Sequence, residues 1–156
     1  MEFTFTHNSP YNTQILGAGV VYDVQSRGLT SKHTTIHRDG TPVAEIDWHS
    51  WSSSVLRMGG EIYKVNDFLR RSGFLGNKRK FQLQGHSYTW KTFGNLITLE
   101  RDSAPIAELT RRTLRDSKLH VAEDASSIMD PLVATLIIMW RLQRRKNGSA
   151  AAAAGA

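Results

Sequence analysis

The side chains of this sequence that could do chemistry form two groups, one of acids with a histidine and one of cations. Glu45, Asp47 and His49 alternate along one predicted strand and therefore share a face, an arrangement that a metal site or a hydrolase could use. The same alternation is typical of the solvent-facing side of any strand. We therefore favour a solvated strand face, and a hydrolase that uses Asp47 and His49 stays as a second alternative.

The cations are densest in one short region of the chain. Arginine forks and lysine ammonium groups suit the oxygens of a phosphate, so this region is the candidate site for an anion or a lipid head group. The formal net charge of +6 and the pI near 9.9 also favour anionic partners. An ordinary solvated surface produces the same clusters, and a nucleic acid partner is not expected. The candidate residues are Arg70, Arg71, Lys78, Arg79 and Lys80.

Several classes of enzyme lack their usual signs in this sequence. The chain has no cysteine, which leaves no disulfide, no thiolate zinc site and no cysteine nucleophile. Its six histidines are scattered without a His-x-x-x-His pair, and the serines of segment 50–54 lack the Gly-x-Ser-x-Gly elbow. We therefore expect a protein that is not an enzyme and has no cofactor or metal ion.

The strongest pattern in the chain is an internal repeat. The segment Thr35–Met58 aligns without a gap with Thr98–Val121, 63 residues later, and eight of the 24 aligned positions are identical. Chance pairing would give roughly one or two identities, so the duplication must be part of the fold. The repeats extend over about 20–72 and 83–145.

Each copy predicts a β-hairpin. The dipeptides Asp39-Gly40 and Asp102-Ser103 are turn signals, and each is followed by a strand that opens near a proline. Further runs of alternating apolar residues bring the total to about ten strands in a mostly antiparallel sheet. One Glu–Arg pair recurs in each hairpin and predicts a cross-strand contact, Glu45 with Arg38 and Glu108 with Arg101.

Each copy also predicts a helix after its last strand. Asp67 and Asp130 are aligned and fit the N-cap position, and Pro131 fits the first helical turn. The first helix is short and ends at Gly73. The second runs from Asp130 to about Arg145 and is apolar on every side, which indicates a helix surrounded by protein. Its predicted core residues are Leu132, Leu136, Ile137, Met139 and Trp140.

These elements predict one domain over residues 1–146 and a flexible tail over 147–156. A duplicated sheet can bury one apolar helix by curving around it, so we expect a closed or strongly curved barrel of two pseudo-symmetric halves around the C-terminal helix. The strand Pro42–Ile46 and the helix Asp130–Trp140 resemble an uncharacterised domain family of mushroom-forming fungi. Its architecture is similar to the tubby C-terminal, phospholipid-scramblase and LURP-one-related domains.

The expected function is therefore binding. A partner protein is favoured, through an exposed apolar patch that could include Trp51, Phe74 and Leu75. The resemblance to tubby domains implies an alternative, which is peripheral binding of an anionic membrane lipid such as a phosphoinositide. Because the start of the chain shows no secretion signal and no apolar run reaches the ~20 residues of a membrane span, we expect a cytoplasmic monomer, at a membrane surface in the lipid alternative.

Overall fold

The structure is a computed structural model that describes residues 1–49 and 54–154, with side chains described up to residue 149. Trp51 lies outside the described residues. The helices are α1 (Val65–Phe68), the 3-10 helix η1 (Glu123–Ile128) and α2 (Met129–Ala154). The strands are β1 (Glu2–Phe5), β2 (Thr13–Gly17), β3 (Val20–Arg27), β4 (His33–Arg38), β5 (Thr41–Asp47), β6 (Val55–Met58), β7 (Glu61–Lys64), β8 (Arg70–Ser72), β9 (Lys78–Leu83), β10 (His86–Phe93), β11 (Leu96–Arg101), β12 (Ala104–Thr110) and β13 (Lys118–Val121).

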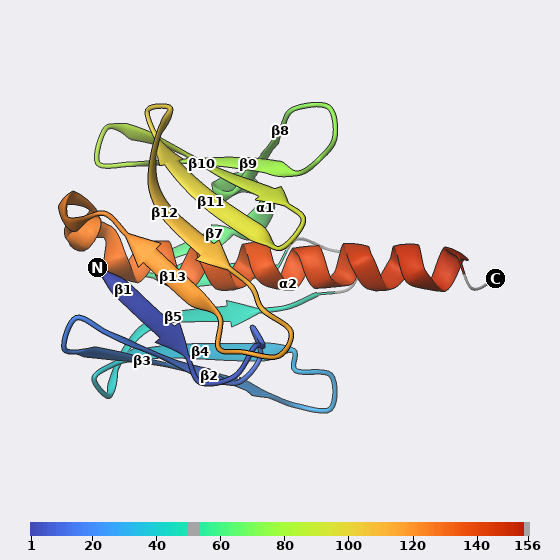
Figure 1. The fold of residues 1–156 in the computed structure, drawn as a ribbon, viewed down its shortest axis with the longest axis horizontal. Coiled ribbons are helices and arrows are strands. Elements are labelled where there is room, and N and C mark those ends of the chain that lie inside the picture. The colour runs from blue at the N-terminus through green and yellow to red at the C-terminus, as the bar shows by residue number, and fades with distance from the viewer. Residues whose placement is uncertain (50–53, 155–156) are drawn as a thin grey trace.

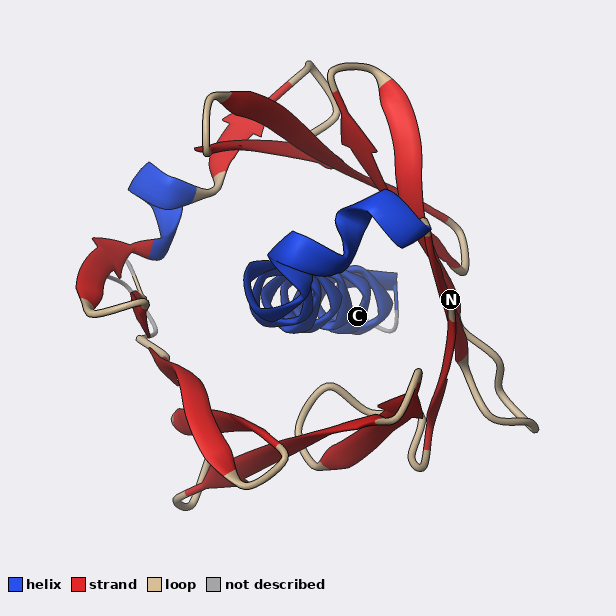
Figure 2. Ribbon diagram, turned by 90° about the vertical axis from the view of Figure 1, so that its left-hand side faces the viewer, coloured by secondary structure: helices blue, strands red, loops and turns tan. Residues whose placement is uncertain are grey.

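The strands form one antiparallel sheet in the order β7-β6-β5-β4-β3-β2-β1-β13-β12-β11-β10-β9-β8. The N-terminal half (β1–β7) and the C-terminal half (β8–β13) are each a run of neighbouring hairpins (Figure 1). They join where β1 pairs with β13, for example at Phe3 and Leu119. Figure 2 shows the strands arranged around α2, which is seen along its axis.

A mostly β fold with a C-terminal helix is thus confirmed, and thirteen strands replace the predicted ten. Closure into a barrel is not confirmed. The strands β7 and β8 stand at the two ends of the order, and no strand pairing within residues 1–49 and 54–154 joins them.

The two predicted hairpins have the same irregularity at aligned positions. The pairing of β4 with β5 shifts register between Ile36 and His37, and the pairing of β11 with β12 shifts between Leu99 and Glu100. The predicted Glu–Arg pairs within these hairpins are wrong. Arg38 and Arg101 directly precede the two turns, so they lie opposite Thr41 and Ala104. The glutamates are farther from the turns, and Glu45 pairs with Thr35 and Glu108 with Thr98.

The helix α2 is buried between the two halves. Residues 132–140 are all buried, including Leu132, Leu136, Ile137, Met139 and Trp140. Polar contacts also fix the helix, since the Trp90 indole donates a hydrogen bond to Thr135 Oγ1 at 2.9 Å. The segment Glu123–Ser149 is long and apolar enough to cross a membrane, although 72% of its most apolar window is buried within the protein.

Four predictions about the helices are wrong. The helix α1 begins at Val65, so Asp67 lies inside its single turn, and Arg70–Ser72 is strand β8. The helix α2 begins at Met129, so Asp130 lies in its first turn, after the cap position, whereas Pro131 lies in the first turn as predicted. It also continues through Asn147 and Gly148 to Ala154, because the alanines that follow have the highest helix propensity of all residues.

Candidate functional site

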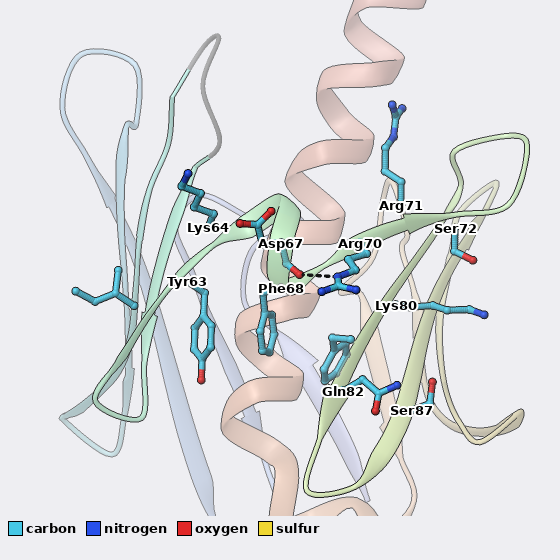
Figure 3. Close-up of a pocket in the computed structure, with 12 residues that line it drawn as sticks. Tyr63, Lys64, Asp67, Phe68, Arg70, Arg71, Ser72, Lys80, Gln82 and Ser87 are labelled. Carbon is cyan, nitrogen blue, oxygen red and sulfur yellow. Dashed lines mark hydrogen bonds between the residues drawn. The ribbon is translucent and has the colours of Figure 1, made fainter.

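A hollow lies where the sheet is not joined, around α1. It has a volume of about 820 Å³. We call it the seam pocket (Figure 3). The pocket is lined by Ile62, Tyr63 and Lys64 of β7, Asp67 and Phe68 of α1, Arg70, Arg71 and Ser72 of β8, Lys80, Phe81 and Gln82 of β9, and Ser87 of β10.

Two strand edges border the seam pocket. The strand β7 pairs with β6, and its other edge has no strand neighbour within the described part of the chain. The strand β8 is short and covers β9 only at Lys78–Lys80, so residues 81–83 of β9 pair with β10 alone. Edge strands carry backbone N–H and C=O groups that are free to pair with another chain. The two edges are not joined because the chain between β7 and β8 forms the helix α1 instead of a turn that would pair these strands.

Aromatic rings hold the seam together. Tyr63 lies 4.7 Å from Phe68, Phe68 lies 5.4 Å from Phe81, and Phe81 lies 4.9 Å from Tyr88, measured between ring centroids. The four rings link β7, α1, β9 and β10 through side chains alone. Such aromatic pairs contribute about 0.5–1.5 kcal/mol each beyond the area that they bury.

The rim of the seam pocket is cationic. Lys64, Arg70, Arg71 and Lys80 line it, together with one carboxylate, that of Asp67. All five side chains are exposed. The Arg70 Nε donates a hydrogen bond to the backbone O of Asp67 at 3.2 Å, which holds this guanidinium against the end of α1 (Figure 3). The pocket is therefore suited to a ligand with both apolar groups and negative charges.

The five predicted cations divide between the two faces of the β8–β9 hairpin. Directly paired residues share a face, so Arg70 and Lys80 lie on one side, and Arg71 and Arg79 on the other. Lys78 pairs with Ser72 and joins the first set, since side chains alternate along a strand. Arg70, Arg71 and Lys80 line the seam pocket, whereas Lys78 and Arg79 do not.

Arg79 has a structural role. Its guanidinium donates hydrogen bonds to Leu69 O at 2.9 Å and to Asn66 Oδ1 at 3.2 Å, so it fixes the chain that follows α1. Burial, and next the nearby charge of Arg71, lower the pKa of Arg79 below its usual value. Arg79 therefore positions the chain around α1 and does not line the seam pocket.

The predicted Glu45, Asp47 and His49 group does not assemble. The Asp47 carboxylate contacts His33 Nδ1 at 2.5 Å and also the Arg57 guanidinium, and these hydrogen bonds lower the pKa of Asp47. His49 is exposed beyond the end of β5, and its backbone N–H donates to Ser54 Oγ. Among the described residues, no three His, Asp or Glu side chains form a group that could hold a metal ion.

Asp67 and Asp130, which the repeat aligns, have different surroundings. The Asp130 Oδ1 accepts a hydrogen bond from the Tyr22 hydroxyl at 2.7 Å and forms an ion pair with the Arg38 guanidinium at 3.0 Å. Burial, and next the hydrogen bond to Asp130, raise the pKa of Tyr22. Asp130 therefore joins α2 to the N-terminal half of the sheet, and Asp67 lines the seam pocket at the surface.

Sequence reasoning missed the aromatic part of the site. Tyr63 lies on β7 just before α1, Phe68 is the last residue of α1, and Phe81 follows the basic run on β9. The sequence shows only that each of these aromatic residues lies close, along the chain, to the predicted basic cluster. It could not show that β7 and β9 face each other across the seam.

Comparison of the chain with curated proteins and with solved structures finds no match. A family of unknown function, DUF6593, matches residues 8–145 and so includes the seam pocket, most of the sheet and the buried part of α2. The chain belongs to this family of unknown function, DUF6593.

Proposed function

We propose that this protein is a non-enzymatic interaction module that binds an extended, acidic segment of a partner protein in the seam pocket. The observation that carries the proposal is the pair of free strand edges, at β7 and at residues 81–83 of β9, on either side of a hollow of about 820 Å³. An extended peptide can add to such an edge through main-chain hydrogen bonds, and pockets for its side chains then give specificity.

The walls of the seam pocket favour the chemistry of such a segment. Tyr63 and Phe68 are partly exposed and offer ring surface to the apolar side chains of a bound strand, and the buried Phe81 supports the ring of Phe68. The exposed Arg70 and Lys80 favour carboxylates on the alternate side chains. Alternation of acidic and apolar residues is therefore the expected pattern of the ligand.

The resemblance to tubby-like domains belongs to the same proposal. A single antiparallel sheet around a C-terminal helix supports kinship with that group at the level of architecture. The phosphoinositide alternative would use the outer face of the β8–β9 hairpin, where Arg70, Lys78 and Lys80 lie together. Its support is this charge alone, so the peptide is the ligand that we favour.

The experiment is a titration with a synthetic nine-residue peptide of alternating glutamate and valine. We expect saturable binding that weakens at least tenfold in an Arg70→Glu/Lys80→Glu variant. The matched control is Arg112→Glu/Arg115→Glu, which reverses two exposed charges far from the seam and should bind as the wild type does. A second control is the same peptide with alternate backbone amides methylated, which cannot form the strand hydrogen bonds.

Two results would contradict the proposal. One is binding of the methylated peptide with unchanged affinity, because charge alone would then account for the contact. The other is equal loss of affinity in both double variants, which would indicate attraction to the whole basic protein instead of the seam pocket.

A further inference from the structure

The two ends of the sheet carry different connections. At one end the strands are joined by turns of two residues, such as 39–40 between β4 and β5 and 102–103 between β11 and β12. At the other end the connections include the longer loops 28–32, 73–77 and 111–117, together with the turn 94–95. We call the second the loop end. Figure 1 shows that α2 projects from the sheet at this end.

Contacts with α2 hold these loops together around the helix. The Arg141 guanidinium donates a hydrogen bond to Ser31 O in loop 28–32. Gln143 Nε2 donates to Gly94 O at 3.2 Å, and Lys146 Nζ donates to Leu75 O at 3.3 Å. The loop end is therefore one surface built from several distant parts of the chain.

This surface carries most of the strongly exposed apolar side chains of the described residues. Each loop or turn presents one or two of them, and their exposed fractions run from 75% to 108%. Exposed apolar side chains favour burial, and nothing among the described residues covers these. Phe74 and Leu75 share the loop 73–77, Leu29 and Leu114 lie on two other loops, and Phe93 is the last residue of β10. The residues are Leu29 at 108%, Phe74 at 106%, Leu75 at 75%, Phe93 at 81% and Leu114 at 95%.

The loop end is also strongly basic. Exposed cations lie on the same loops as the apolar tips and on the segment 144–146 of α2. In the loops 28–32, 73–77 and 111–117, the turn 94–95 and the helix segment 141–149, the sequence has one carboxylate, Asp116. The exposed cations of these segments are Lys32, Arg112, Arg115, Arg144, Arg145 and Lys146.

We propose that the loop end docks on an anionic lipid bilayer. The apolar tips enter the interface between head groups and acyl chains, and the surrounding cations bind the anionic head groups. A bilayer is favoured over a protein partner because apolar tips on several loops, with cations beside them, can all enter one soft and anionic surface without matching a fixed shape. This proposal uses a surface other than the seam pocket and does not depend on the peptide ligand.

Vesicle sedimentation of the whole chain tests the proposal, with phosphatidylcholine vesicles and with vesicles that contain about one third phosphatidylserine. We expect binding to the anionic vesicles that falls steeply as the salt concentration rises. A Phe74→Ser/Leu114→Ser variant and an Arg144→Glu/Arg145→Glu variant should each bind at least tenfold more weakly. Two matched controls should bind as the wild type does, namely Val21→Ser for the apolar change and Arg70→Glu/Lys80→Glu for the charge change.

A second measurement uses the absence of cysteine from the natural sequence. A polarity-sensitive dye on Leu114→Cys should shift to the blue when anionic vesicles are added, and the same dye on Val21→Cys should not shift. The proposal is overturned if the chain does not bind anionic vesicles at low salt, or if both loop-end variants bind as the wild type does. Loss of binding in Arg70→Glu/Lys80→Glu alone also overturns it, because the lipid site would then lie at the β8–β9 hairpin.

Discussion

Two junctions connect the halves of the sheet, and they are built from different interactions. At the first, β1 pairs with β13 along three residues, and the buried side chain of Phe3 lies beneath this pairing. At the second, β7 and β8 have no strand pairing in the described residues, and the rings of Tyr63, Phe68 and Phe81 link the two sides. Backbone pairing uses the N–H and C=O groups of both strands, so no other chain can pair there. Side-chain packing leaves these groups free to pair with another chain.

The largest expected contrast comes from one aromatic residue at each junction. Phe3→Ala should lower the free energy of unfolding by about 3–5 kcal/mol, since Phe3 is 1% exposed and the core cannot fill the cavity. Phe68→Ala should lower it by only about 1–2 kcal/mol, because Phe68 is half-buried and loses two ring contacts. Urea unfolding measures both values. Equal losses would show that the second junction is as tightly packed as the first.

Two glycines that face the strands of the junctions give the next contrast, namely Gly17 of β2 beside β1 and Gly76 of the β8–β9 loop beside Arg71 of β8. A Cβ on Gly17 would clash with the backbone O of Glu2, so Gly17→Ala must displace β1 and should cost about 1–3 kcal/mol or more. A Cβ on Gly76 would meet only the end of the Arg71 side chain, at 3.2 Å, so Gly76→Ala costs about 1 kcal/mol for its positive φ. Thermal unfolding should therefore place Gly17→Ala below Gly76→Ala, and the reverse order would contradict the comparison.

The aligned aspartates Asp130 and Asp67 sharpen the same contrast. Asp130→Asn weakens the contacts with Tyr22 and Arg38 and should cost about 1–2 kcal/mol. Asp67→Asn should change stability by less than about 0.5 kcal/mol, as at most surface positions. The same unfolding experiment compares the two variants. A cost for Asp67→Asn as large as that for Asp130→Asn would mean that Asp67 holds the seam.

The smallest expected effect is a pH dependence in the N-terminal half. Hydrogen bonds from His33 and then from Arg57 hold the pKa of Asp47 below its usual value of 3.8. The stability that Asp47 contributes is therefore present above about pH 4 and is lost as the pH falls toward its lower folded-state pKa. Unfolding midpoints measured from pH 6 to pH 2 should fall less in Asp47→Asn than in the wild type. An identical acid dependence in both proteins would show that Asp47 contributes nothing.

The sequence predicts the parts of the fold that have a periodic or repeated signal. The turns Asp39-Gly40 and Asp102-Ser103 lead to the hairpins β4–β5 and β11–β12, and the apolar run after Pro131 leads to the buried part of α2. These signals are local and strong. They depend on turn chemistry and on the alternation of apolar residues along each strand.

The elements that build the seam pocket have no such signal. The strand β8 is Arg70–Ser72, three polar residues at a sheet edge, and the strand β7 is four residues long with three of them exposed. Short edge strands bury little, so apolar alternation is absent. The approach of Phe81 to Phe68 depends on the curvature of the whole sheet, which no local pattern shows.

Arg141 shows the same limit at the loop end. It belongs to a basic run that is typical of a solvated helix end, yet it is 2% exposed. Its guanidinium lies 4.2 Å from the Trp48 ring centroid and 4.7 Å from that of Tyr11, and burial lowers its pKa to about 10. Two aromatic rings from distant strands and loops make this environment, so the sequence alone could not predict it.

Amide hydrogen exchange of the free protein, read by mass spectrometry, tests most directly whether the seam differs from the paired junction. Free strand edges exchange faster than paired strands. We expect fast exchange in β7 and at residues 81–83, slow exchange in β1 and β13, and protection of the seam when the alternating glutamate–valine peptide is added. Equal, slow exchange at both junctions in the free protein would contradict the account, because the seam would then have no free edge for a partner to bind.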